Sequence, residues 1–282
     1  MKKTILILGT CILLAGCSKL EENIPFLKKM DDTAEEQNNQ LNDEIGNKGG
    51  NNHTGNKNSS NPGQLDDSIT LKAKYFNQVK QVDGKYVIQN PANVLALVNH
   101  QFGLPSTYAP NDLVRPKVAF SFGNQNIEKS YLRKKAAAAL EKMFAEAKKQ
   151  NIELYAVSGY RSYERQEELF HAEINRVGKE KAVQAVAVPG TSEHQTGLAV
   201  DISSKSVNLD LTEQFGTTPE GKWLVKNAHK FGFILRYPKD KESITGYQYE
   251  PWHFRYVGTK AAKVIYEKNL TLEEYFDIVE KI

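Results

Sequence analysis

Residues 192–201 read SEHQTGLAVD, and this stretch runs from a polar loop into an apolar strand. His194 lies in the Gly- and Thr-rich loop, and Asp201 follows seven residues later inside the strand that we predict over Leu198–Ile202. A histidine and a carboxylate at this spacing can share a metal ion, but a hydrogen-bonded pair inside a protein gives the same pattern. This stretch alone leaves both interpretations open.

A second short motif, EPWH, adds Glu250 and His253. With His194 and Asp201, His253 completes a set of two histidines and one carboxylate, which leaves a coordination position open, as in catalytic zinc sites. Glu250 is then a candidate for the general base that takes a proton from metal-bound water. Residues i and i+3 of a regular strand point to opposite faces, so we expect Pro251 to bend the chain and bring Glu250 and His253 together.

The hydrophobic patterns around these motifs predict short strands set between helices. Apolar residues recur at helical spacing through the Ala-, Glu- and Lys-rich segment 127–149. Ser162 is expected to cap a helix that ends at Gly178, and Thr271 to cap a later one with Glu274. Helices are also expected at 179–188, 219–231 and 260–268, and strands at 85–88, 153–158, 198–202, 233–236 and 249–256. Together they predict an α+β fold, one compact domain whose small antiparallel sheet is flanked by helices and carries the zinc site.

The N-terminus has the plan of a bacterial export signal. Residues 1–17 give a basic start, an apolar run too short to span a bilayer comfortably, and small residues before Cys17. The sequence LAGC resembles a lipobox, so we expect Cys17 to be acylated and to tie the chain to the outer face of the cell membrane; a plain signal peptide is the alternative. Cys11 lies within the signal, so the mature chain would have no free thiol.

Residues 18–68 never build a core pattern. Between residues 42 and 64 there are seven Asn and five Gly, with one large apolar residue, Ile45. Such a segment cannot bury enough apolar surface to offset its ordering entropy, so we expect a flexible stalk. The folded domain is then expected over residues 69–282, within the usual size of one domain.

Composition and missing motifs narrow the function. The net charge of +3 disfavours nucleic-acid binding by bulk charge, and the composition excludes a multi-span membrane protein. No serine is followed by lysine three residues later and Lys-Thr-Gly does not occur, which disfavours a penicillin-binding serine carboxypeptidase. The absence of H-E-x-x-H excludes that type of metalloprotease.

Three motifs in order give the chain a family resemblance. They are Ser158-Gly159-Tyr160-Arg161-Ser162 with Gln166, the Ser-x-His-x-x-Gly-x-Ala-x-Asp stretch, and Glu-Pro-Trp-His. Over roughly residues 90 to 275 the sequence resembles the VanY-type zinc D,D-/L,D-carboxypeptidases, including LdcB-like bacterial lipoproteins, and no motif position departs from the family pattern.

The resemblance implies a role for each motif residue. It implies one Zn²⁺ per chain held by His194, Asp201 and His253, with Glu250 as general base. It implies that Arg161 approaches the substrate carbonyl or carboxylate, and that Gln166 and Ser192 hydrogen-bond the terminal D-alanine. A surface salt bridge for Arg161, an exposed helix position for Gln166 and a loop cap for Ser192 are the alternatives. Trp252 is expected either as a pocket wall or as a core aromatic.

The expected activity is removal of the C-terminal D-alanine from peptidoglycan stem peptides. The D,D and L,D bonds differ by one residue and by stereochemistry, and the sequence favours L,D only slightly. A zinc endopeptidase or amidase of the same fold, and a non-catalytic wall-binding lipoprotein, are the other candidates; the second would have lost a ligand or the base, and all four residues are present. We expect a monomer with no cofactor beyond zinc.

Overall fold

The computed structural model describes residues 69–282. The predicted signal peptide, Cys17 and the predicted stalk lie outside the described residues. Within residues 69–282, no helix combines the length and the apolar character that crossing a bilayer requires.

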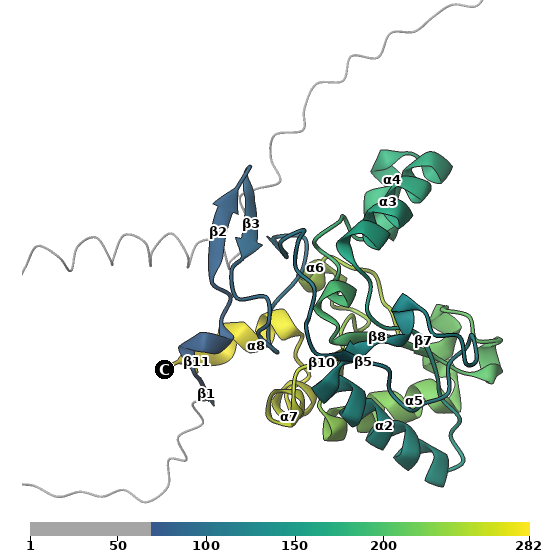
Figure 1. Ribbon diagram of the computed structural model, residues 1–282. Helices are drawn as coiled ribbons and strands as arrows, with labels where there is room; N and C mark the ends of the chain where they lie inside the picture. Colours follow the sequence, from purple (N-terminus) through teal and green to yellow (C-terminus); the bar gives the residue numbers. More distant parts are fainter. Residues whose placement is uncertain (1–68) are drawn as a thin grey trace, which may run out of the picture. The chain divides into compact units, whose positions relative to one another are not determined.

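A four-stranded antiparallel sheet forms the centre of the domain (Figure 1). Its strands are β7 (Tyr155–Ser158), β8 (Ala199–Ser203), β9 (Phe233–Leu235) and β10 (His253–Tyr256), in the order β7-β8-β10-β9. Helices surround this sheet, so the predicted α+β fold with a small antiparallel sheet is confirmed.

The two faces of the sheet have different chemistry because successive side chains of a strand alternate. Val200 and Ile202 of β8 and Phe254 of β10 belong to the hydrophobic core, together with Leu140 of α2 (Lys134–Lys149) and Leu224 of α5 (Pro219–Asn227). On the opposite face, Asp201 and His253 are direct partners in the β8–β10 register. The sheet therefore packs through one face and presents polar chemistry on the other.

Two helices project from the body beside the polar face (Figure 1). They are α3 (Tyr163–Val177) and α4 (Lys179–Ala185), joined at Gly178. The Ser162 side chain accepts a hydrogen bond from the Arg165 amide, so the predicted helix cap is confirmed. The predicted extension of the second helix to residue 188 is wrong, because it ends at Ala185.

The helix predicted from residue 127 begins only at Lys134. Residues 128–130 form a 3-10 turn, and β6 (Leu132–Arg133) pairs with β5 (Leu113–Val114). The carbonyl groups of Lys129 and Tyr131 accept hydrogen bonds from the amides of Gly159 and Tyr160. Tertiary hydrogen bonds therefore hold extended backbone where local propensity favours a helix.

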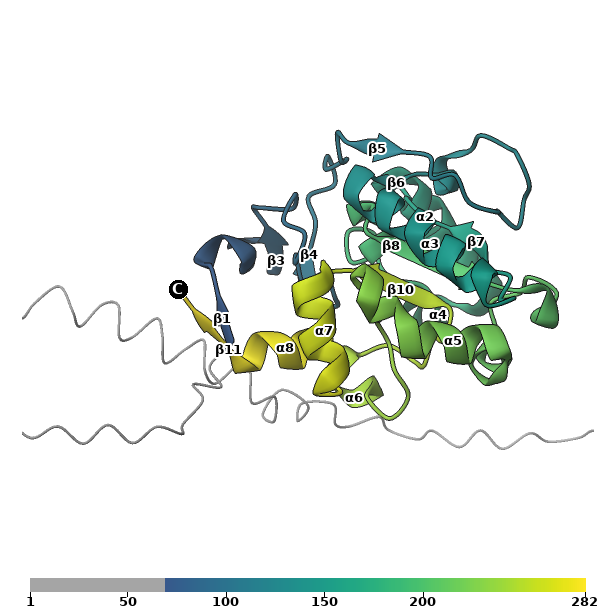
Figure 2. The same cartoon turned by 90° about the horizontal axis from the view of Figure 1, so that it is seen from below.

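The ends of the described chain lie side by side (Figure 2). The parallel pair β1 (Ile69–Leu71) and β11 (Val279–Lys281) joins them, and the sequence analysis did not predict this pair. The predicted strand at 85–88 is confirmed as β3 (Lys85–Ile88), between β2 (Val79–Val82) and β4 (Phe102–Gly103).

The remaining elements connect these parts. The Thr271–Glu274 capping box is confirmed at the start of α8. The other α-helices are α6 (Glu242–Thr245), α7 (Thr259–Glu267) and α8 (Leu272–Ile278). Short 3-10 turns occupy Ala73–Tyr75, Glu193–Thr196, Lys205–Val207, Glu213–Thr217 and Ala228–Phe231.

Candidate active site

The three predicted metal ligands meet on the polar face of the sheet. Nε2 of His194 lies 3.3 Å from Oδ2 of Asp201, and Nδ1 of His253 lies 3.1 Å from Oδ1 of Asp201. All three side chains are buried, and one ligand atom from each lies within 4.8 Å of the other two. Two imidazole nitrogens and a carboxylate are donors that zinc takes in proteins, so the set fits a zinc ion.

The backbone of Gly159 orients His194. The Nδ1–H group of His194 donates to the Gly159 carbonyl at 2.6 Å, which leaves Nε2 free to face Asp201. A Cβ atom at position 159 would lie 2.5 Å from the carbonyl oxygen of Tyr131, so only glycine fits where these segments meet. This hydrogen bond joins the Ser158-Gly159 segment to the loop that carries His194.

Glu250 lies beside the ligands because the chain turns before β10. The amide of His253 donates to the Glu250 carbonyl at 3.1 Å, and Oε2 of Glu250 lies 3.8 Å from Nδ1 of His253. The bend that we predicted at Pro251 is therefore confirmed. The strand predicted over 249–256 is wrong in its first part, since the turn delays the strand to His253.

The carboxyl group of Glu250 has an unusual environment. Burial raises its pKa to about 7, while the charge of His253 acts in the opposite direction and that of Asp201 raises it further. A carboxylate with a pKa near neutrality is suited to accept and return a proton.

Arg161 lines the same cleft as the ligands from the loop before α3. Its Nη1–H donates to Oε1 of Gln166 at 2.8 Å and its Nη2–H to Oγ of Ser158 at 3.4 Å. Gln166 is 1% exposed and its amide nitrogen donates to the Ala187 carbonyl at 2.6 Å, so the alternative of an exposed position is wrong. Gln166 thus holds Arg161 in place, and its contact with D-alanine stays a prediction.

Ser192 and Trp252 both line the cleft above the ligands. Ser192 is buried at the start of the Glu193–Thr196 turn, and its hydroxyl makes no capping hydrogen bond there. Trp252 is half-buried and also packs against the hydrophobic core. It is therefore both a wall of the cleft and an aromatic side chain at the edge of the core.

The cleft has a volume of 620 Å³, which is within the range of small-molecule and peptide pockets. The ligand cluster and Glu250 line it. Further side chains come from α3 and α4, from the residues that flank these helices and from the segment before β10; among them are Arg161, Leu169, Arg176, Val186, Tyr247 and Tyr249. Burial raises the pKa of Tyr247 to about 12, so this ring stays neutral at physiological pH.

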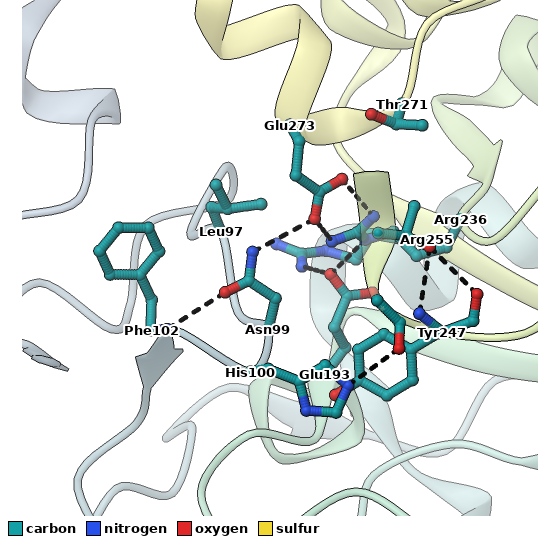
Figure 3. A network of polar contacts seen from close by, with 12 residues as sticks. Leu97, Asn99, His100, Phe102, Glu193, Arg236, Tyr247, Arg255, Thr271 and Glu273 are labelled. Carbon is teal, nitrogen blue, oxygen red and sulfur yellow. Dashed lines mark hydrogen bonds and ion pairs between the residues drawn. The ribbon is translucent and has the colours of Figure 1, made fainter. Parts of the chain in front are cut away.

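The sequence analysis missed a buried ion cluster around Glu193, the residue before the ligand His194 (Figure 3). Glu193, Arg236 and Arg255 are fully buried, and both guanidinium groups donate to Glu193. One signal in the sequence could have revealed this cluster. Arg236 and Arg255 lie next to or inside short apolar strands, where charged residues are rare unless they are paired. His100 lies at the edge of this region, where it stacks on Tyr247 with ring centroids 4.3 Å apart.

The chain is similar to known carboxypeptidases. Residues 129–259 match the family model described as VanY, D-alanyl-D-alanine carboxypeptidase. The chain is 60% identical over 214 residues to the YodJ protein of Bacillus subtilis (strain 168), covering 76% of this chain and 78% of that protein.

Two solved structures extend the comparison. One is the structure of the LdcB LD-carboxypeptidase, which describes the molecular basis of peptidoglycan recognition by that enzyme. It is 60% identical to this chain with a TM-score of 0.74, and the match covers 76% of this chain and 100% of that one. The vancomycin-resistance D,D-pentapeptidase VanY, solved as a mutant with Zn(II), is 35% identical with a TM-score of 0.52, over 65% of this chain and 98% of that one. Because the chain is this similar to these relatives over most of its length, it belongs to the VanY family of D-alanyl-D-alanine carboxypeptidases.

Proposed function

We propose that the protein is a zinc-dependent carboxypeptidase that removes the C-terminal D-alanine from peptidoglycan stem peptides. The observation that carries the proposal is the convergence of His194, Asp201 and His253 with Glu250 in one cleft. The Zn(II) in the VanY structure and the peptidoglycan recognition described for LdcB support the metal and the substrate.

Each residue of the site then has a task. A zinc ion held by the three ligands would polarise the scissile carbonyl and acidify a water molecule. Glu250 would take a proton from the attacking water and return it to the leaving amino group of D-alanine. Arg161, whose guanidinium is always charged, stabilises the negative charge that develops on the carbonyl oxygen.

We propose the L,D bond as the preferred one, because LdcB matches this chain at 60% identity and the D,D-pentapeptidase VanY at 35%. The test is to incubate the purified zinc-loaded chain with defined tetra- and pentapeptide stems, with and without a chelator, and to measure D-alanine by mass spectrometry. We expect chelator-sensitive release from the tetrapeptide in preference to the pentapeptide. Absence of release from both stems would contradict the carboxypeptidase proposal, and preferential release from the pentapeptide would contradict the L,D preference.

We propose further that the enzyme acts as a lipid-anchored monomer on the outer face of the cell membrane, with residues 18–68 as its stalk. The lipobox-like sequence before Cys17 supports the anchor. Changing Cys17 to Ala is expected to abolish incorporation of labelled fatty acid and to move the enzyme from the membrane fraction to the medium. Retention of both label and membrane association in Cys17→Ala would contradict the anchor.

The pH dependence follows from Glu250. Only the ionised carboxylate accepts a proton, so activity is present above its pKa and is lost as the pH falls through it. A bound cation favours the ionised form, so we expect the acidic limb of kcat/KM between the ordinary value of 4.5 and the value of about 7 that burial gives. The check is a pH profile in which zinc content is measured at every point. A flat profile over this range, with zinc retained, would exclude Glu250 as the base.

A further inference from the structure

Glu193 is a buried carboxylate that contacts the predicted ligand His253 at the ring nitrogen that does not face Asp201. Its side chain has 0% exposure. The Nε2–H group of His253 donates to Oε2 of Glu193 at 3.4 Å, whereas Nδ1 of His253 faces Asp201. A proton held on Nε2 by a carboxylate leaves the lone pair of Nδ1 for a metal ion.

Two buried arginines fix the position of Glu193. Oε1 of Glu193 accepts hydrogen bonds from Nε of Arg236 at 2.8 Å and from Nη1 of Arg255 at 2.7 Å. Arg255 lies within β10, and Arg236 directly follows β9 with its amide donating to the His253 carbonyl at 3.1 Å, so the backbones of both are tied to the strand that carries His253. Buried charges are tolerated when they are paired and hydrogen-bonded, and here any shift of the carboxylate would break a hydrogen bond to each guanidinium group.

The arginines are held in turn by segments far away in the sequence (Figure 3). Nη1 and Nη2 of Arg236 donate to both oxygens of Glu273 in α8, at 2.8 and 2.6 Å. Nη2 of Arg255 donates to the carbonyl groups of Val94 and Ala96, at 3.1 and 2.9 Å. These partners lie outside residues 129–259, which the family model matches.

Together, Glu193, Arg236, Arg255 and Glu273 form a neutral cluster of two carboxylates and two guanidinium groups, called the ion cluster below. The ring of Tyr237 also stacks on His253, with centroids 4.9 Å apart and an angle of 29° between the ring planes. His253 is therefore restrained both at one ring nitrogen and on one face.

We propose that Glu193 is a positioning residue that sets the tautomer and orientation of His253 for zinc, and that Glu273 contributes to zinc affinity through Arg236. The inference rests on the proposed zinc site. It assigns to α8 and to the segment around Val94–Ala96 a part in metal binding, which they exert through Arg236 and Arg255.

The test is the zinc dissociation constant of the full chain, measured by competition with a chromophoric chelator. In Glu193→Gln the charge that holds the Nε2 proton is lost, and we expect zinc binding to weaken about 10- to 100-fold, which is typical for loss of a carboxylate partner of a metal-binding histidine. The Co²⁺-substituted variant is expected to show an altered visible absorption spectrum, which a general loss of stability would not produce while the protein is folded.

Glu273→Gln provides a second variant in case Glu193→Gln does not fold. It weakens one end of the ion cluster at a side chain that is 14% exposed, and we expect zinc to bind about 2- to 30-fold more weakly. The matched control is Lys241→Ala, which removes the Lys241–Glu274 ion pair of 2.8 Å at the same helix without touching Arg236, and should leave the constant unchanged.

The outcomes separate this inference from the proposed function. Wild-type chain that binds no zinc contradicts both. Wild-type chain that binds zinc, with the same constant and the same Co²⁺ spectrum in every folded variant, overturns only the positioning role of the ion cluster.

Discussion

Glu250→Gln is expected to keep zinc and to lose turnover. Glutamine has nearly the same shape as glutamate, and Glu250 is not one of the three ligands, so the metal content should stay at the wild-type level. The amide cannot take a proton from water, and loss of a general base lowers rates by about 10²–10⁴-fold. The measurement is kcat/KM for D-alanine release, together with zinc content by mass spectrometry of the same sample.

Glu280→Gln is the matched control, because it makes the same substitution at an exposed carboxylate of β11. We expect it to leave both kcat/KM and zinc content unchanged. Near-normal hydrolysis by Glu250→Gln would show that another group acts as the base. Loss of zinc from this variant would instead make Glu250 part of the metal site.

His194→Ala is expected to lose both zinc and turnover. The change removes a ligand nitrogen and the 2.6 Å hydrogen bond to Gly159, so two of the contacts that build the site vanish together. Zinc affinity should fall by more than the roughly 100-fold that loss of an outer hydrogen-bond partner can cost. Zinc content after dialysis and D-alanine release are the two readouts.

His171→Ala serves as its control, since His171 is an exposed residue of α3. Wild-type zinc content in His194→Ala would contradict the ligand set. Full activity with no zinc would contradict metal-dependent catalysis altogether.

The central features of the site could be predicted because they are local in the sequence. Asp201 lies within an apolar strand pattern. Pro251 predicts a turn that brings Glu250 and His253 together. The capping signals at Ser162 and Thr271 were equally local and are confirmed. These predictions depended on spacing and on the chemistry of a few side chains, whereas the assignment of His194, Asp201 and His253 to one ligand set also depended on the family resemblance.

The features that sequence reasoning missed are set by contacts across long distances in the chain. The late start of α2 depends on hydrogen bonds from Gly159 and Tyr160, and the β1–β11 pair joins the two ends of the described residues. The ion cluster connects Glu193 with Glu273, eighty residues later, and no local pattern encodes that pairing.

The most direct test of the proposed function is a zinc titration of metal-free enzyme. Zinc is added in steps to a known concentration of the purified chain, and D-alanine release from a tetrapeptide stem is measured after each step. We predict activity that rises from the background in proportion to zinc and stops rising at one ion per chain, as expected for one site built by His194, Asp201 and His253. Activity that is independent of zinc, or that requires a second ion, would contradict this account.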